Sequence, residues 1–436
     1  MTGLPRPVIA NFLRLYGQVA AGQTGEIREK DILPVTDLPV YSDLLSYKTA
    51  GEKQLAKLVI LKLNGGLGTS MGLRQAKTLL PVKDGLNFLD IIVRQSGQSK
   101  LVLLNSFSTD NDTRTYLAKY PQIEFLRQNK HPKIYCDTLE PAAEIIENWN
   151  WNPPGHGDLY PVLADSGLLE RWLEDGCEYL FISNSDNLGA APDPAMLGYL
   201  AERKLPFLME VARRTPADLK GGHLVRYPDG RLALREVAQI NPEDQDAAQD
   251  IGRHKYFNTN SMWLSLRALA NLLADYEQIF PLPLIRNPKP VNPEDRDSRK
   301  VYQLETAAGA AIEFFPSAAA VETPRERFVP VKKCADLLAL WSDLYILTKT
   351  GCLTVNPRRA LPPILIDLDE KYFSFIQDFT ARVTQPPSLV DCSSLKLRGD
   401  IILGIDVVFR GRVSLFNPGQ QLKLERRIFA DVEARL

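Results

Sequence analysis

A glycine-rich stretch, LNGGLGTSMG at residues 63–72, is followed by a lysine, Lys77. It comes directly after the apolar run 58–61, so it is expected to leave a β-strand at the strand's carboxyl end. Glycines at such a turn let successive backbone N–H groups point at one ligand, and this arrangement suits phosphate oxygens. The stretch therefore predicts a site for a phosphate-bearing ligand, with a ligand-free turn as the alternative.

The spacing of the glycines separates this loop from two well-known phosphate loops. Gly66, Gly68 and Gly72 read GxGxxxG, which is one residue longer than the GxGxxG pattern of dinucleotide-binding folds. The Walker A pattern needs a lysine directly after its last glycine, whereas Lys77 is five residues beyond Gly72. The loop matches neither pattern, and its spacing disfavours a nicotinamide-dependent dehydrogenase.

Two further strings place polar side chains where a ligand can approach. NPPGHGDLY, at residues 152–160, sets His156 between two glycines, where its ring can donate a hydrogen bond to a phosphate or sugar hydroxyl; a structural histidine is the alternative. FISNSDNLGA, at residues 181–190, ends an apolar run with Asn184 and Asp186. We predict Asp186 as a ligand of Mg²⁺, since a carboxylate at a strand end can share the ion with phosphates and waters; a turn built from Asn and Asp is the alternative.

Bulk properties exclude several classes of protein. The 436 residues carry a formal net charge of −1, which gives no general attraction to nucleic acid or to an anionic membrane. The five cysteines lack a CxxC pair and the four histidines lack metal spacing, so a disulfide framework and a zinc site are disfavoured. No apolar run approaches the ~18 residues of a membrane span, and no secretory signal is visible, so we expect a cytoplasmic protein with small-molecule ligands.

Short apolar runs alternate with amphipathic stretches from residue 58 onward, which is the rhythm of a doubly wound α/β sheet. Strands are predicted at 58–61, 101–104, 179–182 and 207–211. Helices are predicted at 168–173, 196–200 and 337–347, and helical spacing at residues 9–16 marks a lead-in that packs on the main domain. On its own the segment around Glu305 reads as an ordinary helix, and the asparagines at 258 and 260 read as turn or cap residues.

The tail after Pro387 differs from the rest of the chain. LKLRGDIILGIDVVFRGRVSLFNPG alternates apolar residues with Gly399, Gly404 and Gly411, as expected for short strands that turn at regular intervals. Stacked parallel coils of a small β-helix are favoured, with an antiparallel hairpin domain as the alternative. Paired prolines at 362 and 363 mark the stretch that connects the tail to the main domain.

Together these strings resemble the eukaryotic-type UDP-glucose pyrophosphorylase (UTP–glucose-1-phosphate uridylyltransferase) family. The resemblance covers about residues 58–347 and, more loosely, the GDIILG tail; it also rests on NSFSTDNDT, ADLKGG, FNTNSMW, QLETAAGAAIEFF and FVPVK, which occur in the family's order. It implies an α/β fold with a Rossmann-like nucleotidyltransferase catalytic domain at 56–348, built on a mixed, mostly parallel sheet. A helical lead-in at 1–55, and a linker with a small left-handed parallel β-helix at 349–436, would flank it.

The resemblance also implies a reaction and a set of site residues. A phosphate oxygen of glucose 1-phosphate would attack the α-phosphorus of UTP in line, reversibly giving UDP-glucose and pyrophosphate, with Mg²⁺ as cofactor and without a general base. The nucleotide would be held by Leu63, Asn64, Gly65, Gly66, Gln128, Gly155 and Asn184. The sugar and its phosphate would be held by His156, Lys220, Gly222, Glu236, Asn258, Asn260 and Glu305. Lys77 and Lys332 would be catalytic, by neutralising phosphate charge.

Two alternatives to this function stay open: a related enzyme with a different or broader range of sugars, such as N-acetylglucosamine 1-phosphate, and a noncatalytic sensor of nucleotide sugars. The chain also departs from the family's pattern. Ala76 precedes the loop lysine where proline is common, which bears on the placement of Lys77. His223 follows Gly222 where threonine is common, which bears on a contact near the sugar. We expect a monomer or small homo-oligomer.

Overall fold

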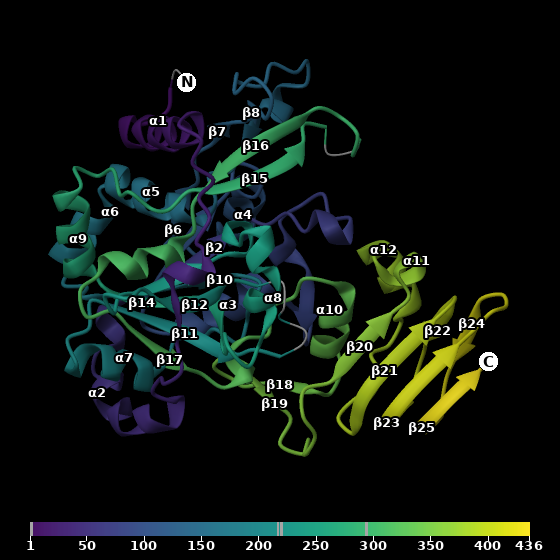
Figure 1. Cartoon of the computed structure of the whole chain (residues 1–436). Coiled ribbons are helices and arrows are strands. Elements are labelled where there is room, and N and C mark those ends of the chain that lie inside the picture. The colour runs from purple at the N-terminus through teal and green to yellow at the C-terminus, as the bar shows by residue number, and fades with distance from the viewer. Residues whose placement is uncertain (1–2, 216–217, 219–220, 293–294) are drawn as a thin grey trace.

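One mixed β-sheet organises the chain, of which the computed structural model describes residues 3–215, 218, 221–292 and 295–436. Seven of the strands found there run in the order β1 (Leu33–Pro34), β12 (His223–Arg226), β14 (Tyr256–Ser265), β10 (Tyr179–Asn184), β2 (Leu58–Asn64), β5 (Lys100–Asn105) and β6 (Glu124–Arg127). Three more attach beside them: β11 (Phe207–Arg213), β13 (Leu232–Arg235) and β17 (Ala319–Glu322). Figure 1 shows this sheet at the centre of the larger part of the molecule.

The parallel half of the sheet consists of β10, β2, β5 and β6. The side chains of β2 alternate between two apolar layers, with Leu58 and Ile60 in one and Val59 and Leu61 in the other, so both faces of the strand are covered. The four predicted strands are confirmed as β2, β5, β10 and β11. At their carboxyl ends β2 and β10 are neighbours, with Leu63 opposite Asn184, so the glycine-rich loop and the SNSDN string leave the sheet side by side.

The prediction of a mixed sheet is confirmed, but the sheet is not mostly parallel. Among the described strands, four of its pairings are parallel and five are antiparallel. The antiparallel part is organised by β14, which pairs with β10, with β11 and, at Phe257, with β12. The asparagines at 258 and 260 hid this strand in the sequence, because asparagine is rare in strands and tertiary pairing here overrides its local preference.

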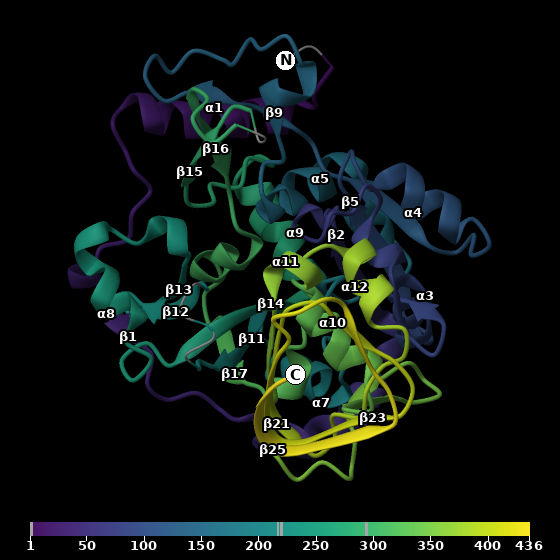
Figure 2. The same ribbon diagram turned by 90° about the vertical axis from the view of Figure 1, so that its right-hand side faces the viewer.

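Helices cover both faces of the sheet (Figures 1 and 2). Side chains of α3 (Phe88–Ser96), α4 (Asp110–Leu117), α7 (Pro194–Glu202) and α10 (Cys334–Trp341) pack in the layer that holds Leu58, and those of α5 (Leu159–Ser166), α6 (Leu168–Glu174) and α9 (Leu266–Asp275) pack in the layer that holds Val59. The predicted helices at 168–173 and 196–200 are confirmed. Within the described ranges, no helix is both long and apolar enough to cross a bilayer.

The predicted helix at 337–347 is wrong beyond Trp341. Residue Ser342 is extended, with ψ −178°, and ends α10. The chain then forms β18 (Tyr345–Leu347), antiparallel to β19 (Leu353–Val355). Between α10 and β18, Asp343 accepts hydrogen bonds from the backbone N–H groups of Leu389 and Val390. The segment that leaves the helix thus binds a stretch of the tail.

An N-terminal helix, α1 (Arg6–Ala20), confirms the helical spacing at residues 9–16. Its apolar face packs near a second sheet, formed by β15 (Ile285–Pro290), β16 (Lys300–Glu305) and β8 (Ile134–Tyr135), and Leu15 shares an apolar cluster with Ile134 and Leu304. Glu305 ends the strand β16, so the helical prediction for its segment is wrong there. Within that segment only residues 308–314 are helical, as a 3₁₀ helix. Short elements complete this part of the chain: α2 (Lys48–Glu52), β3 (Pro81–Lys83), β4 (Leu86–Asn87), β7 (His131–Pro132), β9 (Trp151–Asn152) and α8 (Gln245–Gln249).

The tail forms parallel strands that lie side by side in Figure 1. One sheet has the order β20 (Leu365–Leu368), β21 (Cys392–Arg398), β23 (Val407–Phe416) and β25 (Arg427–Arg435), and a second pairs β22 (Ile401–Leu403) with β24 (Leu422–Leu424). All of these pairings are parallel, so the antiparallel hairpin alternative is wrong. The helices α11 (Glu370–Phe373) and α12 (Ile376–Arg382) lie between β20 and β21 in the chain. Their buried Phe373 and Phe379, like Leu395 of β21, belong to the apolar cluster that holds Leu58.

Candidate functional site

A pocket of about 1000 Å³ opens where β2 and β10 end. Sixteen of the predicted site residues line it: Leu63, Asn64, Gly65, Gly66, Lys77, Gln128, Gly155, His156, Asn184, Asp186, Gly222, Glu236, Asn258, Asn260, Glu305 and Lys332. The remaining one, Lys220, lies outside the described residues. The structure therefore brings together strings from distant parts of the sequence, while the role of each residue stays a prediction.

The glycine-rich loop bends sharply and returns to the end of its own strand. Gly68 and Gly72 have φ of 69° and 71°, the left-handed region that favours glycine, on either side of a 3₁₀ turn. A β-carbon at Gly68 would lie 2.7 Å from Cδ1 of Leu73, so a side chain there would force Leu73 to move. The backbone N–H of Lys77 donates to the carbonyl of Gly66 at 3.2 Å. Lys77 thereby returns to the strand end despite lying well beyond it in sequence.

Two lysines meet at the carboxylate of Asp186. The ammonium of Lys77 donates to Oδ2 of Asp186 and, at 2.9 Å, to the carbonyl of Val331. The ammonium of Lys332 donates to the same Oδ2 at 2.7 Å. Only 10% of the Asp186 side chain and 11% of that of Lys77 are exposed, whereas 58% of that of Lys332 is, so Lys332 is the more open of these two lysines. Burial alone would raise the pKa of Asp186, but Lys332 and Lys77 outweigh it and hold that pKa below its ordinary value.

One oxygen of Asp186 is open to a further ligand. Its Oδ1 is buried and has no hydrogen-bond partner within the described protein. The described residues contain no group of three or more His, Cys, Asp or Glu side chains that could hold a metal by themselves. A single carboxylate oxygen fits Mg²⁺, because this ion is commonly bound through one or two carboxylates while substrate phosphates and waters fill the octahedral shell.

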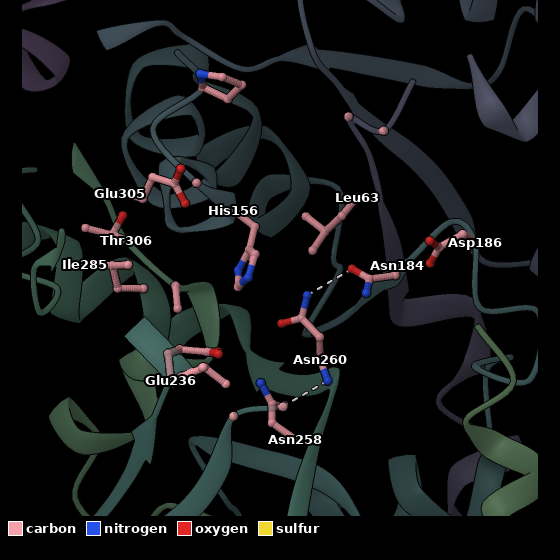
Figure 3. A pocket seen from close by; sticks show the side chains of 18 of the residues that line it. Leu63, His156, Asn184, Asp186, Glu236, Asn258, Asn260, Ile285, Glu305 and Thr306 are labelled. Atoms are coloured by element: carbon pink, nitrogen blue, oxygen red, sulfur yellow. Dashed lines mark hydrogen bonds between the residues drawn. The ribbon is translucent and has the colours of Figure 1, made fainter. Parts of the chain in front are cut away.

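His156 is a neutral hydrogen-bond donor at the pocket wall. Its Nδ1 accepts the backbone N–H of Ala308 at 2.8 Å, and burial together with the charge of Lys332 lowers its pKa to about 4. A neutral imidazole that accepts at Nδ1 carries its proton on Nε2. Figure 3 shows this ring pointing into the space between Asn260 and Glu305. The preceding Gly155 has φ 79°, and a β-carbon there would lie 2.4 Å from the carbonyl of Thr306, so only glycine allows this approach.

Two asparagines of β14 turn their side chains into the pocket (Figure 3). Asn260 has φ 56°, and the pairing of β14 with β11 shifts register beside it. Its backbone N–H donates to Oδ1 of Asn258 at 2.9 Å, and its Nδ2 donates to Oδ1 of Asn184 at 2.9 Å. The amide oxygen of Asn260 is buried without a partner in the described part of the chain. A ligand hydroxyl can satisfy it, since buried polar atoms are nearly always hydrogen-bonded.

Carboxylates on the opposite wall have weakened acidity. Burial raises the pKa of Glu236 to about 7, although a hydrogen bond from Asn258 opposes the shift. Burial also raises the pKa of Glu305 above its ordinary value. A β-carbon at Gly222 would lie 2.6 Å from Oε2 of Glu236, so the glycine keeps this carboxyl accessible. Near pH 7 Glu236 can therefore donate or accept a hydrogen bond, which suits the hydroxyl groups of a sugar.

Polar side chains near the strand end of β2 divide into a pocket-facing and an inward set. Gln128 donates through Nε2 to the carbonyl of Gly155 at 3.1 Å, and a β-carbon at Gly65 would lie 3.0 Å from its Oε1. Asn64, in contrast, donates through Nδ2 to Asn105 at 2.8 Å and to Thr113 at 2.9 Å. The amide of Asn64 is thus engaged beneath the loop, so this residue lines the pocket without offering its side-chain donors to a ligand.

Sequence reasoning missed several lining residues. Arg286 and Asn287 of β15 reach the pocket, as do Phe257, Phe328 and Thr306. No local signal marks the first two, because they lie in the string IRNPKP, whose prolines indicate an irregular segment and not a hairpin over a pocket. Thr306 could have been found, because it follows Glu305 in QLETAAGAAIEFF, one of the strings on which the family resemblance rests.

The side chain of His223 does not line the pocket, although this residue follows Gly222 and pairs with Phe257, both of which do. Its side chain is fully buried in β12, and its ring centre lies 4.5 Å from that of His254. Neither ring nitrogen has a hydrogen-bond partner in the described structure. Burial, together with the charges of His254, Arg214 and Arg235, lowers the pKa of His223 to about 2.

The fold and the pocket place the chain in the class of α/β nucleotidyltransferases, and comparisons with known proteins identify the family. Residues 9–410 match the family described as UTP–glucose-1-phosphate uridylyltransferase. The enzyme of that name from Hordeum vulgare is 40% identical over 430 residues, which cover 93% of this chain and 88% of the relative. The chain therefore belongs to the UTP–glucose-1-phosphate uridylyltransferase family.

Solved structures agree with this assignment. A mutant of the UDP-glucose pyrophosphorylase from Leishmania major, solved in complex with UDP-Glc, is 40% identical and superposes with a TM-score of 0.91, covering 100% of this chain and 96% of that one. The UDP-glucose phosphorylase from Trypanosoma brucei is 43% identical and superposes with a TM-score of 0.87; the match covers 99% of this chain and 97% of that one.

Acid should destabilise the protein through His223. Because its pKa is about 2 when folded, the unfolded chain takes up a proton below about pH 6.5 that the folded chain excludes, and stability falls as pH falls. Relative to wild type, His223→Thr should gain about 1.4 kcal/mol in unfolding free energy between pH 7.5 and 5.5. Urea unfolding at the two pH values measures this. Leu224→Ala, a buried change on the same strand, should show a pH-independent difference; an equally constant difference for His223→Thr would contradict the assignment.

Proposed function

We propose that this protein transfers the uridylyl group of UTP to glucose 1-phosphate, reversibly, with UDP-glucose and pyrophosphate as products. The observation that carries the proposal is the convergence of Lys77 and Lys332 on Asp186, beside a glycine-rich loop and across from a wall of hydroxyl-binding side chains. Membership of the family supports it, as does a close structural relative solved with UDP-Glc.

The two ends of the pocket suit the two parts of the product. The glycine-rich loop and Gln128 offer backbone N–H groups and an amide, which suit phosphates and the edge of a uracil ring. Around Asn258, Glu236 and His156 lie neutral donors, a carboxyl group and an amide, which suit a hexose. The exposed ammonium of Lys332 pairs with Asp186 and its charge also acts on the ring of His156, so it is near both ends, as a phosphate-bridged product requires.

The chemistry needs charge neutralisation more than proton transfer. A phosphate oxygen of glucose 1-phosphate forms a bond to the α-phosphorus of UTP while the bond to the β-phosphate bridging oxygen breaks, and the electron pair leaves with pyrophosphate. The attacking oxygen is already anionic at neutral pH, so no base is needed. Lys332 offsets the repulsion between the two anions, and buried Lys77 stabilises charge that grows on the triphosphate.

Mg²⁺ is proposed as the cofactor, with Asp186 as its protein ligand. The open Oδ1 of this carboxylate is the oxygen that would hold the ion, while Oδ2 stays with the lysines. When bound, the ion would neutralise phosphate charge and align the phosphates.

The division of the chain is also a proposal: a lead-in at 1–55, a catalytic domain at 56–348, and a linker with a short left-handed β-helix at 349–436. It is supported by the path of the tail, since β21, β23 and β25 lie in one parallel sheet while β22 and β24, which alternate with them along the chain, form another. Such alternation is typical of a coil that passes from one sheet to the next and back.

Turnover tests the function directly. Purified protein with Mg²⁺ and UTP should release pyrophosphate with glucose 1-phosphate, and release should be much slower with N-acetylglucosamine 1-phosphate or galactose 1-phosphate. Comparable release with several sugar phosphates would favour the broader-specificity alternative. No release with any of them would leave only a nucleotide-sugar sensor, and would overturn the proposal.

Lys332→Ala should lower kcat about 10²- to 10³-fold, by analogy with removal of a transition-state donor. Folding should be nearly unaffected, because the side chain is largely exposed. Steady-state kinetics and thermal unfolding measure the two effects. Lys333→Ala is the matched control, since this neighbouring lysine is exposed and lies outside the pocket lining. An undiminished kcat in Lys332→Ala would remove this lysine from the mechanism.

Gln128→Ala should weaken the preference for UTP over other nucleoside triphosphates. A site that hydrogen-bonds a base edge rejects the wrong base by leaving its own groups unpaired, and removal of the amide lifts that penalty. The ratio of kcat/KM for UTP to that for CTP reports the effect. Gln122→Ala is the control, because this glutamine is exposed, precedes β6 and lies outside the pocket lining, so it should keep the wild-type ratio. A wild-type ratio in Gln128→Ala would show that the amide does not read the base.

A further inference from the structure

The NSFSTDNDT string at residues 105–113 has no place in the pocket lining, yet it contacts the glycine-rich loop repeatedly. It forms the turn after β5 and the first residues of α4. We call residues 105–113 the loop bracket, because its hydrogen bonds reach both ends of the glycine-rich loop.

At the start of the loop, the bracket binds two consecutive carbonyl groups. Oγ1 of Thr109 donates to the carbonyl of Asn64 at 2.7 Å, and Oγ of Ser106 donates to the carbonyl of Gly65 at 3.0 Å. Beyond the loop, Oγ1 of Thr78 donates to Oδ1 of the same Asn64 at 2.9 Å. The strand end and the residue after Lys77 are therefore held through one asparagine.

At the end of the loop, the bracket binds the residue before the lysine. The backbone N–H of Ala76 donates to Oδ2 of Asp112 at 3.2 Å. The next N–H, that of Lys77, donates to the carbonyl of Gly66. Asp112 itself is half-buried and does not line the pocket, so its side chain has no direct access to a ligand there.

The conformation of Ala76 explains why such a bond is useful. Its φ is −54° and its ψ is 124°, and the φ lies within the range that a proline ring enforces. Alanine has no ring to hold this angle, and an unrestrained alanine samples several backbone conformations. A carboxylate that accepts its N–H selects one of them. The hydrogen bond from Ala76 to Asp112 thus restrains the backbone at residue 76, as the ring of a proline at that position would.

We propose that Asp112 is a positioning residue for Lys77: by binding the N–H of Ala76 it fixes the backbone from which Lys77 reaches Asp186. The proposal rests on the proposed function and deepens it, because it names the group that positions Lys77, one of the two lysines proposed to bind phosphate. It concerns a lysine that would act on the triphosphate in the transition state, so its loss of position should appear in kcat/KM for UTP.

A double-mutant cycle tests this inference. Asp112→Ala should lower kcat/KM for UTP about tenfold, since a hydrogen bond to a charged group is worth roughly a factor of ten or more. Asp112→Asn, which keeps an oxygen acceptor, should retain most of the activity. In the Ala76→Pro background the N–H is gone and φ is fixed, so Asp112→Ala should there change kcat/KM less than twofold. Asn111→Ala, an exposed change on the same turn, is the matched control.

Equal losses from Asp112→Ala in both backgrounds would overturn the proposal, because a general effect on α4 does not depend on residue 76. Hydrogen exchange of the segment 64–78 without substrate gives a second readout, in which Asp112→Ala should exchange at least several-fold faster than wild type and Asp112→Asn should not. Unchanged exchange in Asp112→Ala would also overturn it. This measurement stands even if Ala76→Pro does not fold. It also separates the two hypotheses, since wild-type protein without turnover would refute the proposed function while the exchange still tests the bracket.

Discussion

A single buried carboxylate, that of Asp186, is the constraint on which the site depends. Buried charges persist in proteins only when they are paired, because the loss of hydration is otherwise too costly. Here both partners are lysines from distant segments, one carried by the glycine-rich loop and one by the chain after β17. The ion pairs that offset the cost of burying this carboxylate therefore also bring two cations to the pocket. Asp186 thus contributes both to the stability of the fold and to the composition of the site.

The sheet supplies the two halves of the pocket by different means. Parallel β2 and β10 bring their carboxyl ends together, which is the usual position of ligand sites in open α/β sheets. Antiparallel β14 lies beside them and delivers Asn258 and Asn260 from mid-strand, through a shift of register and a left-handed residue. The side of the pocket proposed for phosphates is thus built from strand ends and loops, whereas much of the side proposed for the sugar is built on a strand with a shift of register and a left-handed residue.

Much of this architecture could be predicted from the sequence, for reasons that are local. β2 and the position of Asp186 could be predicted because an apolar run followed by glycine or aspartate marks the end of a strand. Ligand sites of open α/β sheets lie at the carboxyl ends of their strands, so the place of the pocket followed. β14 was not, because Asn258 and Asn260 contradict the strand they belong to, and only pairing with β10 and β11 resolves the conflict. Arg286 was invisible for a related reason: its position depends on the hairpin of β15 and β16, a contact that no pattern near it encodes.

The partners of Asp186 also set an order of assembly during synthesis. Lys77 and Asp186 are 109 residues apart, follow the paired strands β2 and β10, and both lie in the first half of the chain, so this pair can form while the second half is still being made. Lys332 lies 146 residues beyond Asp186, and Val331, whose carbonyl receives Lys77, lies beside it. A nascent chain can thus hold a folded glycine-rich loop long before it holds a complete pocket, and the last cation to arrive is the one most open to the ligand.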